Sequence, residues 1–253
     1  MRRVRTRTVE VGGVAMGGGN PVVIQGMTNT FTRDAERTLA QIEAMVRAGA
    51  RLVRVAVPTR SDTAALAEIV RHAPCPIVAD VHFHYERALE AVAAGVAKLR
   101  VNPGNLRDRR ALRRVIAAAK SSGAAIRIGT NTGSIRRPEE LDRPFSRREL
   151  LARMLEELEA YVRFFERARF QKLVLSAKSP DLDLTVRMGE AVARRFDYPQ
   201  HLGVTHAGTA RAGTIKSAAA LAILLRKGIG DTIRVSLAGD PVREIEVAGE
   251  LLA

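Results

Sequence analysis

The sequence predicts a (β/α)8 TIM barrel, and three observations support this fold class. Short apolar stretches of strand type alternate with longer amphipathic stretches of helix type, and this alternation occurs eight times. Within the strand-type stretches the polar residues keep to one side, as expected where that side faces the interior of a barrel. No linker of low complexity interrupts the sequence, so we expect a single domain over residues 1–253.

The chain is expected to begin with a β-hairpin over about residues 4–16. Two Val-containing runs flank Gly12-Gly13, a pair typical of a tight turn. Because this hairpin precedes the first strand–helix pair, we expect it to close the bottom of the barrel as a plug. The first barrel strand is predicted at Val22–Gln25, and an amphipathic helix follows at about Arg33–Ala48.

The remaining seven pairs repeat the same pattern of an apolar run, a turn and an amphipathic segment. The predicted strands are Leu52–Val57, Ile77–Asp80, Lys98–Val101, Ala125–Gly129, Lys172–Ser176, Leu202–Thr205 and Thr232–Ser236. The predicted helices are Ser61–Arg71, Tyr85–Ala94, Asp108–Ser121, a long helix that ends at about Ala168, Leu182–Arg194, Arg211–Lys227 and Pro241–Leu252.

The chain carries a net charge of +14, and arginine makes up most of its basic residues. Such a surplus favours an anionic partner, but many arginines, such as Arg109 and Arg113, fall on one helix and are typical of a solvated face. Aromatic residues that could stack on bases are few, so we expect no nucleic-acid partner. No apolar run has membrane-spanning length and no signal-peptide core is present, so we expect a cytoplasmic protein with no membrane partner.

Four of the predicted strands carry an arginine on the side opposite to their apolar face. These residues are Arg54, Arg100, Arg127 and Arg234. Burying four guanidinium groups inside a barrel costs much free energy unless counter-charges accompany them. One interpretation is a structural ion-pair network in which Asp80 pairs with an arginine. The interpretation that we favour is an anionic ligand at the carboxyl ends of the strands, where barrel active sites lie.

The stretch from Ala125 to Arg136 is typical of a phosphate site. Arg127 lies on the inner side of its strand, and the strand runs into Asn131-Thr-Gly-Ser134. The small and polar residues of that turn allow backbone N–H groups to face an anion. We therefore expect this stretch to contribute to an anion site.

The histidines raise the alternative of a metal-dependent hydrolase. His82 and His84 are two residues apart on an extended segment and so share a face, and His206 follows the seventh strand. Cys75 is the only cysteine, which excludes an internal disulfide framework and any cluster held by thiolates of these residues alone. Cys75 lies between two prolines and is expected to be a small buried residue rather than a nucleophile.

Seven blocks of sequence, in one order over nearly the whole chain, carry a family resemblance. The blocks are VVIQGMTNTFTRD, ADVHFHYERAL, KLRVNPGN, IRIGTNTGSI, LVLSAKSPD, HLGVTHAGTARAGTIKSA and GIGDTIRVSL. They resemble the flavodoxin-dependent 4-hydroxy-3-methylbut-2-en-1-yl diphosphate synthases. The resemblance implies a TIM barrel that binds methylerythritol cyclodiphosphate, and an iron–sulfur oxidoreductase that opens this ring reductively in non-mevalonate isoprenoid biosynthesis. It also implies a [4Fe–4S] cluster on a smaller C-terminal domain, flavodoxin or ferredoxin as electron donor, and a homodimer.

Carried over block by block, the resemblance implies two groups of site residues. The residues expected to take part in catalysis are Asp80, His82 and His206. The residues expected to bind the substrate are Arg54, Arg100, Asn102, Arg127, Asn131, Ser134, Lys178, Thr205, Arg234 and Ser236. Converging guanidinium groups suit a diphosphate because they neutralise its charge and bind its oxygens in pairs.

The sequence departs from the family pattern at two points. The three cluster cysteines of the family have no counterpart in the 253 residues, and His206 stands where the family has a carboxylate. We therefore expect that this chain ligates no metal or cluster and needs a cluster domain in trans for turnover. Three interpretations remain open: half of a split enzyme, a truncated gene, and a paralogue that binds a related diphosphate without reducing it.

Overall fold

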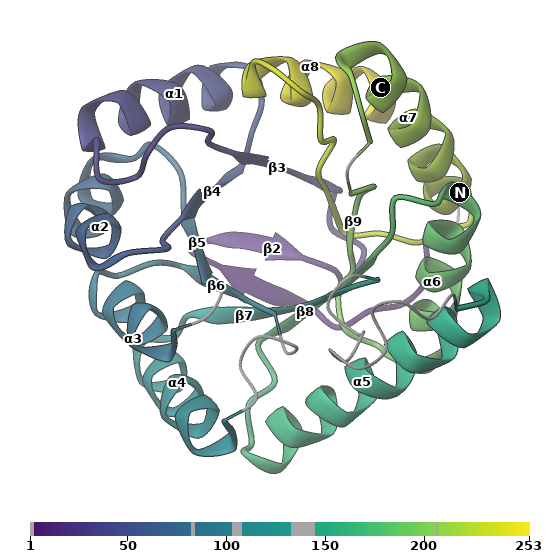
Figure 1. The fold of residues 1–253 in the computed structure, drawn as a ribbon, viewed down its shortest axis with the longest axis horizontal. Helices are drawn as coiled ribbons and strands as arrows, with labels where there is room; N and C mark the ends of the chain where they lie inside the picture. Colours follow the sequence, from purple (N-terminus) through teal and green to yellow (C-terminus); the bar gives the residue numbers. More distant parts are fainter. Residues whose placement is uncertain (1–2, 82–83, 103–107, 133–144, 206) are drawn as a thin grey trace.

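The computed structural model is a barrel of parallel strands surrounded by helices (Figure 1). It describes residues 3–81, 84–102, 108–132, 145–205 and 207–253. The barrel strands are β3 (Val23–Met27), β4 (Leu52–Ala56), β5 (Ile77–Val81), β6 (Lys98–Val101), β7 (Ala125–Asn131), β8 (Leu173–Lys178), β9 (His201–Leu202) and β10 (Thr232–Ile233). The helices are α1 (Ala35–Arg47), α2 (Arg60–His72), α3 (Tyr85–Ala93), α4 (Arg109–Ser122), α5 (Arg147–Arg167), α6 (Leu182–Arg195), α7 (Ala210–Arg226) and α8 (Pro241–Leu252).

The strands follow the order β8-β7-β6-β5-β4-β3-β10-β9, and neighbouring strands pair in parallel. β8 and β9 meet through a bridge between Leu175 and Gln200, which brings the two ends of the sheet together. Each crossover between parallel strands is a helix on the outside of the barrel, as Figure 1 shows. The predicted TIM barrel is confirmed.

Side chains at the helix starts explain where several helices begin. Thr59 and Asp62 form a capping box at the start of α2, and Ser146 and Glu149 form another at the start of α5. In each box the hydroxyl and the carboxylate satisfy backbone N–H groups that have no partner inside the helix. Pro241 occupies the first turn of α8, where its missing N–H costs nothing.

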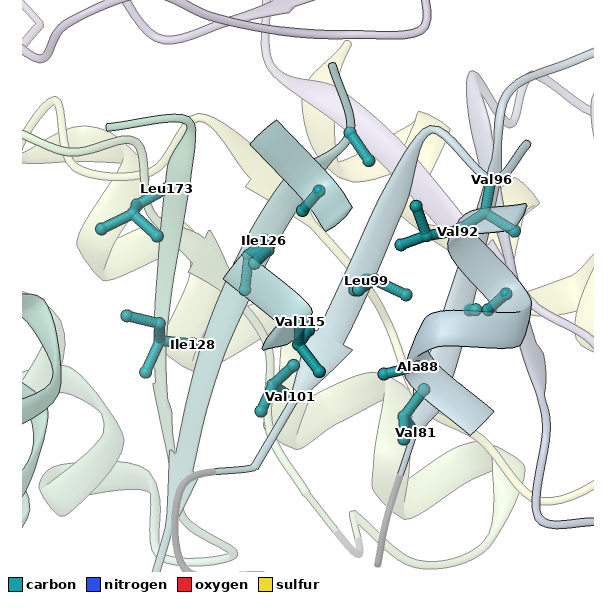
Figure 2. Close-up of a cluster of buried hydrophobic side chains, with 14 of the residues drawn as sticks. Val81, Ala88, Val92, Val96, Leu99, Val101, Val115, Ile126, Ile128 and Leu173 are labelled. Atoms are coloured by element: carbon teal, nitrogen blue, oxygen red, sulfur yellow. The ribbon is translucent and has the colours of Figure 1, made fainter. Parts of the chain in front are cut away.

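The outward faces of the strands form the main hydrophobic core with the helices. Figure 2 shows part of this core, in which Leu99, Val101 and Ile126 from neighbouring strands lie beside Val92 of α3 and Val115 of α4. These side chains are almost fully buried. The predicted assignment of the Val, Leu and Ile residues to the outer side of the strands is therefore confirmed, and the alternate residues point into the barrel.

An N-terminal hairpin, β1 (Val9–Val11) and β2 (Val14–Met16), closes the barrel at the amino ends of its strands. Val11 and Met16 of the hairpin are fully buried. They form one cluster with strand residues that face the inside of the barrel, namely Leu52, Val78, Ala125 and Val174. The predicted hairpin plug is confirmed, and Figure 1 shows it across the centre of the barrel.

Three predicted β-elements are shorter in the structure than the sequence predicted: the hairpin, β9 and β10. The hairpin starts at Val9 because earlier residues bond elsewhere: the Val4 N–H donates to the Gly228 carbonyl, 2.9 Å, and the Arg7 N–H to that of Asp197, 2.7 Å. β9 and β10 each end after two residues. Residues of the segments that follow them, among them Thr205, Arg234 and Ser236, line the cavity described below. Among the residues that the structure describes, no helix is long and apolar enough to cross a membrane.

Replacing Met16 by Ala should lower the free energy of unfolding by about 2–4 kcal/mol, because it leaves a cavity between the plug and the barrel. Urea unfolding followed by circular dichroism measures this loss. Glu10→Ala on the same hairpin is the matched control, since Glu10 is exposed and should change stability little. Equal stability of the two variants would contradict the role of the hairpin as a packed plug.

Candidate functional site

A cavity of about 460 Å³ opens at the carboxyl ends of the barrel strands. Its lining includes nine of the residues that the sequence predicted for the site. They are Arg54, Asp80, Arg100, Arg127, Asn131, Lys178, Thr205, Arg234 and Ser236. The fold therefore gathers these residues from five strands, and from the segments that follow β9 and β10, around one cavity.

The other predicted site residues do not line this cavity in the described part of the chain. Asn102 is buried at the end of β6 without being a lining residue. His82, Ser134 and His206 lie outside the described residues, so the structure says nothing of their positions. The cavity also has lining residues that the sequence did not single out for the site, including Met27, Thr130 and Ser176.

The strand registers place the inward side chains in layers of four from alternate strands, as in other TIM barrels. Counting along the pairings gives one layer with three of the four arginines, and a layer directly below it with the fourth. The upper layer is Arg54, Arg100, Ser176 and Arg234. The lower layer is Gln25, Val78, Arg127 and His201. The four arginines converge because they occupy adjacent layers of one narrow interior.

Asp80 supplies the counter-charge for two arginines of the upper layer. Its Oδ1 lies 3.1 Å from Nη1 of Arg100, and its Oδ2 lies 3.5 Å from Nε of Arg54. The predicted pairing of Asp80 with an inward arginine is confirmed. Burial lowers the pKa of Arg54 to about 10, Asp80 opposes this shift, and Arg234 and Arg100 add to it. The Asp80 carboxylate thus holds two guanidinium groups side by side at the cavity wall.

Glu244 supplies the counter-charge for Arg234, and sequence reasoning missed it. Glu244 lies in the first turn of α8, and its side chain reaches the barrel wall, where Oε2 and Oε1 accept from Nε and Nη2 of Arg234 at 3.1 and 3.2 Å. Only 3% of Glu244 is exposed. Burial raises its pKa, while Arg234 opposes that shift. The alternation of inward and outward residues along the strands could not reveal Glu244, because this residue belongs to a helix.

Arg127 and Lys178 have no carboxylate partner among the described residues. Arg127 is almost fully buried, and its Nε and Nη1 have no hydrogen-bond partner there. Burial and the neighbouring Arg54 and Arg100 hold its pKa well below the ordinary value. Burial and the nearby arginines, Arg127 first, likewise depress the pKa of Lys178. The cavity therefore has a surplus of positive charge, and an anionic ligand would compensate its electrostatic cost.

Two glycines allow these cations to lie against the backbone. A Cβ atom on Gly203 would lie 2.8 Å from Nζ of Lys178 and 2.5 Å from the carbonyl oxygen of Arg234. A Cβ atom on Gly129 would lie 3.4 Å from Nε of Arg100. A larger residue at position 203 would collide with backbone, so this glycine permits the approach of Lys178 to the cavity wall.

Polar side chains continue below the cavity toward the plug. Neither amide atom of Gln25 has a hydrogen-bond partner in the described structure, and neither does Nε2 of His201. Nδ1 of His201 lies 3.3 Å from the Thr232 hydroxyl, and burial, followed by Lys178, holds the His201 pKa well below its usual range. Lys98 is fully buried beneath this layer, with the thioether of Met16 4.0 Å from its Nζ.

The described residues provide no metal centre. No group of three His, Cys, Asp or Glu side chains among them could hold a metal ion. His84 is exposed at the start of α3, and its predicted partners His82 and His206 lie outside the described residues. Cys75 is half-buried rather than fully buried, and it lies two residues before the start of β5 and away from the cavity. Burial raises the pKa of its thiol to about 11, which disfavours the thiolate.

Comparison with known proteins identifies close relatives of the whole chain. The family model described as the GcpE TIM-barrel domain matches residues 6–249. The chain is 44% identical over 250 residues to a 4-hydroxy-3-methylbut-2-en-1-yl diphosphate synthase (flavodoxin) of Malacoplasma penetrans, covering 99% of this chain and 68% of that protein. It is 44% identical over 252 residues to the synthase of the same name from Bacillus anthracis, covering 99% of this chain and 67% of that protein. The chain thus spans about two thirds of the length of these relatives.

Solved structures with much lower identity share the fold. A dihydropteroate synthase from Stenotrophomonas maltophilia superimposes with a TM-score of 0.71 at 16% identity, covering 98% of this chain and 96% of that one. An N-acetylneuraminic acid synthetase from Leptospira borgpetersenii gives a TM-score of 0.66 at 14% identity, covering 98% and 87%. At such identities the likeness concerns the barrel alone.

Replacing Lys98 by Met should raise the free energy of unfolding, because burial holds the pKa of Lys98 well below its ordinary value. Below the folded-state pKa the ammonium group is charged in both states and its full burial cost is present. As pH rises from that pKa toward the unfolded value of about 10.4, the folded state loses its proton first and the cost falls. We expect a gain of about 1–4 kcal/mol at about pH 6 and a smaller one at about pH 9.5.

Urea unfolding at the two pH values measures this difference. Lys120→Met on α4 is the matched control, because Lys120 is exposed and its replacement should leave both the stability and its pH dependence unchanged. A Lys98→Met variant that is less stable than the parent would contradict the interpretation of Lys98 as an uncompensated buried cation.

Proposed function

We propose, since the chain belongs to the family of the GcpE TIM-barrel domain, that its barrel binds methylerythritol cyclodiphosphate for reductive ring opening to 4-hydroxy-3-methylbut-2-en-1-yl diphosphate. The reaction belongs to non-mevalonate isoprenoid biosynthesis. The observation that carries the proposal is the surplus of cations at the cavity. Arg127 and Lys178 face it without a carboxylate among the described residues, beside three arginines that share only Asp80 and Glu244.

The chemistry of the ligand suits this surplus. The two phosphates of a cyclic diphosphate each carry an ionised oxygen, and guanidinium groups bind such oxygens in pairs. In the proposed complex Arg127 and Lys178 gain the counter-charge that the barrel does not provide. Asp80 positions Arg54 and Arg100 against the phosphates through its two ion pairs. The Asn131 amide and the Ser236 hydroxyl at the rim suit the hydroxyl groups of the sugar-derived part.

The residues present do not fit the [4Fe–4S] cluster that the family resemblance implies. Cys75 is the single cysteine of the sequence, its thiolate is disfavoured, and it lies away from the cavity. We therefore propose that the cluster reaches the substrate from outside these 253 residues, with flavodoxin or ferredoxin as electron donor. A homodimer and a cytoplasmic location belong to the same proposal. What these residues supply is binding, orientation and electrostatic compensation.

We propose different roles for the three expected catalytic residues. Asp80 is held between two guanidinium groups by its ion pairs with Arg54 and Arg100, and this geometry favours a positioning role for its carboxylate. His206, at the position of the family carboxylate, is the proposed proton donor, with His82 beside the substrate. A split enzyme, a truncated gene and a non-reducing paralogue would all retain the diphosphate site proposed here.

Replacing Arg127 by Ala should weaken binding of methylerythritol cyclodiphosphate by about 2–4 kcal/mol, because a buried charge-assisted contact is lost. Isothermal titration calorimetry with the purified chain measures the affinity. Arg110→Ala is the matched control, since Arg110 is exposed on α4 and its loss changes the net charge by the same amount. Undetectable binding by the parent chain, or equal affinities of the two variants, would exclude the proposed ligand site.

The purified, iron-free chain should not turn the substrate over by itself, because no residue in it can hold or donate the two electrons. Product formation should begin only when a cluster-bearing domain and a low-potential reductant are added. Chromatographic detection of the linear diphosphate follows the reaction, with the reductant alone as control. Steady turnover without the added domain would show that the chain uses a different chemistry.

A further inference from the structure

Glu244 contacts two parts of the cavity wall although it belongs to a helix outside the barrel. Its carboxylate binds the Arg234 guanidinium through Nε and Nη2, and Oε1 also accepts the Leu237 N–H at 2.8 Å. Arg234 and Leu237 both line the cavity. One buried carboxylate therefore joins α8, the end of β10 and the segment that follows it.

The geometry of this pair determines which part of Arg234 faces the ligand. A guanidinium group has five N–H bonds in a fixed plane. Glu244 occupies Nε–H and one hydrogen of Nη2, so the opposite edge with Nη1 is left for the cavity. The Leu237 hydrogen bond fixes the segment that contains Ser236 and Ala238, both of which line the same cavity. Both contacts limit how far the wall can move.

Arg234 differs in this respect from the other cavity cations among the described residues. Arg54 and Arg100 share the carboxylate of Asp80, and Arg127 and Lys178 have none there. Within this set, only the guanidinium group of Arg234 donates two hydrogen bonds to one carboxylate. This carboxylate also removes a unit of the positive charge that would attract an anion, so its presence opposes binding unless it does something else.

We propose that Glu244 is a positioning residue for the diphosphate: it presents the Nη1 edge of Arg234, and through Leu237 the Ser236 segment, to the bound phosphates. This inference rests on the proposed function of the cavity. It makes a prediction of definite sign. If Glu244 only neutralises Arg234, Glu244→Gln should raise the affinity for the anion, because the unpaired Arg234 is then available to the ligand. If Glu244 positions Arg234, the same substitution should lower the affinity for the anion.

The test measures affinities for methylerythritol cyclodiphosphate and for inorganic pyrophosphate by calorimetry. Glu244→Gln should bind the ligand about tenfold more weakly than the parent chain, as expected for a displaced charge-assisted hydrogen bond. Glu246→Gln is the matched control, because Glu246 lies on α8, forms an exposed pair with Arg243 and should not change the affinity. Thermal unfolding of each variant confirms that it is folded.

Two further variants separate positioning from a general structural effect. Glu244→Asp keeps the charge but shortens the side chain, so positioning predicts weaker binding and simple neutralisation predicts parent affinity. In an Arg234→Ala background, Glu244→Gln should weaken binding less than it does in the parent chain, because only the contact with the Leu237 N–H is left to be altered. Unchanged or tighter binding by Glu244→Gln, or an equal loss with and without Arg234, would overturn the inference. A parent chain that binds pyrophosphate but not the cyclic diphosphate would instead contradict the proposed function, and one that binds neither would contradict both.

Discussion

An excess of buried positive charge is the constraint on which the rest of this structure depends. Most TIM barrels fill the interior with branched aliphatic side chains, whereas this one directs cations from β4, β6, β7, β8 and the segment after β10 into the same space. Such burial is tolerable only with partial compensation. Asp80 and Glu244 supply it for three arginines. Arg127 and Lys178 have no carboxylate partner among the described residues, and burial and the neighbouring cations depress their pKa values.

The fold separates this costly interior from the elements that stabilise it. The outer faces of the strands and the helices bury several hydrophobic clusters, the main one along β4 to β8, and the N-terminal hairpin seals the amino ends with Val11 and Met16. Between the plug and the cavity lies a polar layer that includes Gln25 and His201. The barrel can bury several cations close together at the carboxyl ends of its strands because apolar burial elsewhere supplies the stability.

This division also explains what the chain can contribute to a reaction. In the proposed function the cavity attracts and orients an anion, and Asp80 and Glu244 hold the arginines that would touch it. Its single thiol lies at the opposite end of a strand, with a raised pKa. Under the proposed function, the electrons therefore come from a carrier beyond these residues, and the barrel binds the substrate.

The sequence by itself determined the fold class, the plug and the inward direction of the four arginines, because strand periodicity of two and helix periodicity near 3.6 are local properties. It also indicated that Asp80 would pair with an arginine. Only the tertiary structure decided which arginines share Asp80, that Arg127 has no carboxylate partner among the described residues, and that Glu244 reaches Arg234 from α8. Those facts depend on strand register and on helix placement, which bring together residues far apart in the sequence, and no local pattern encodes them.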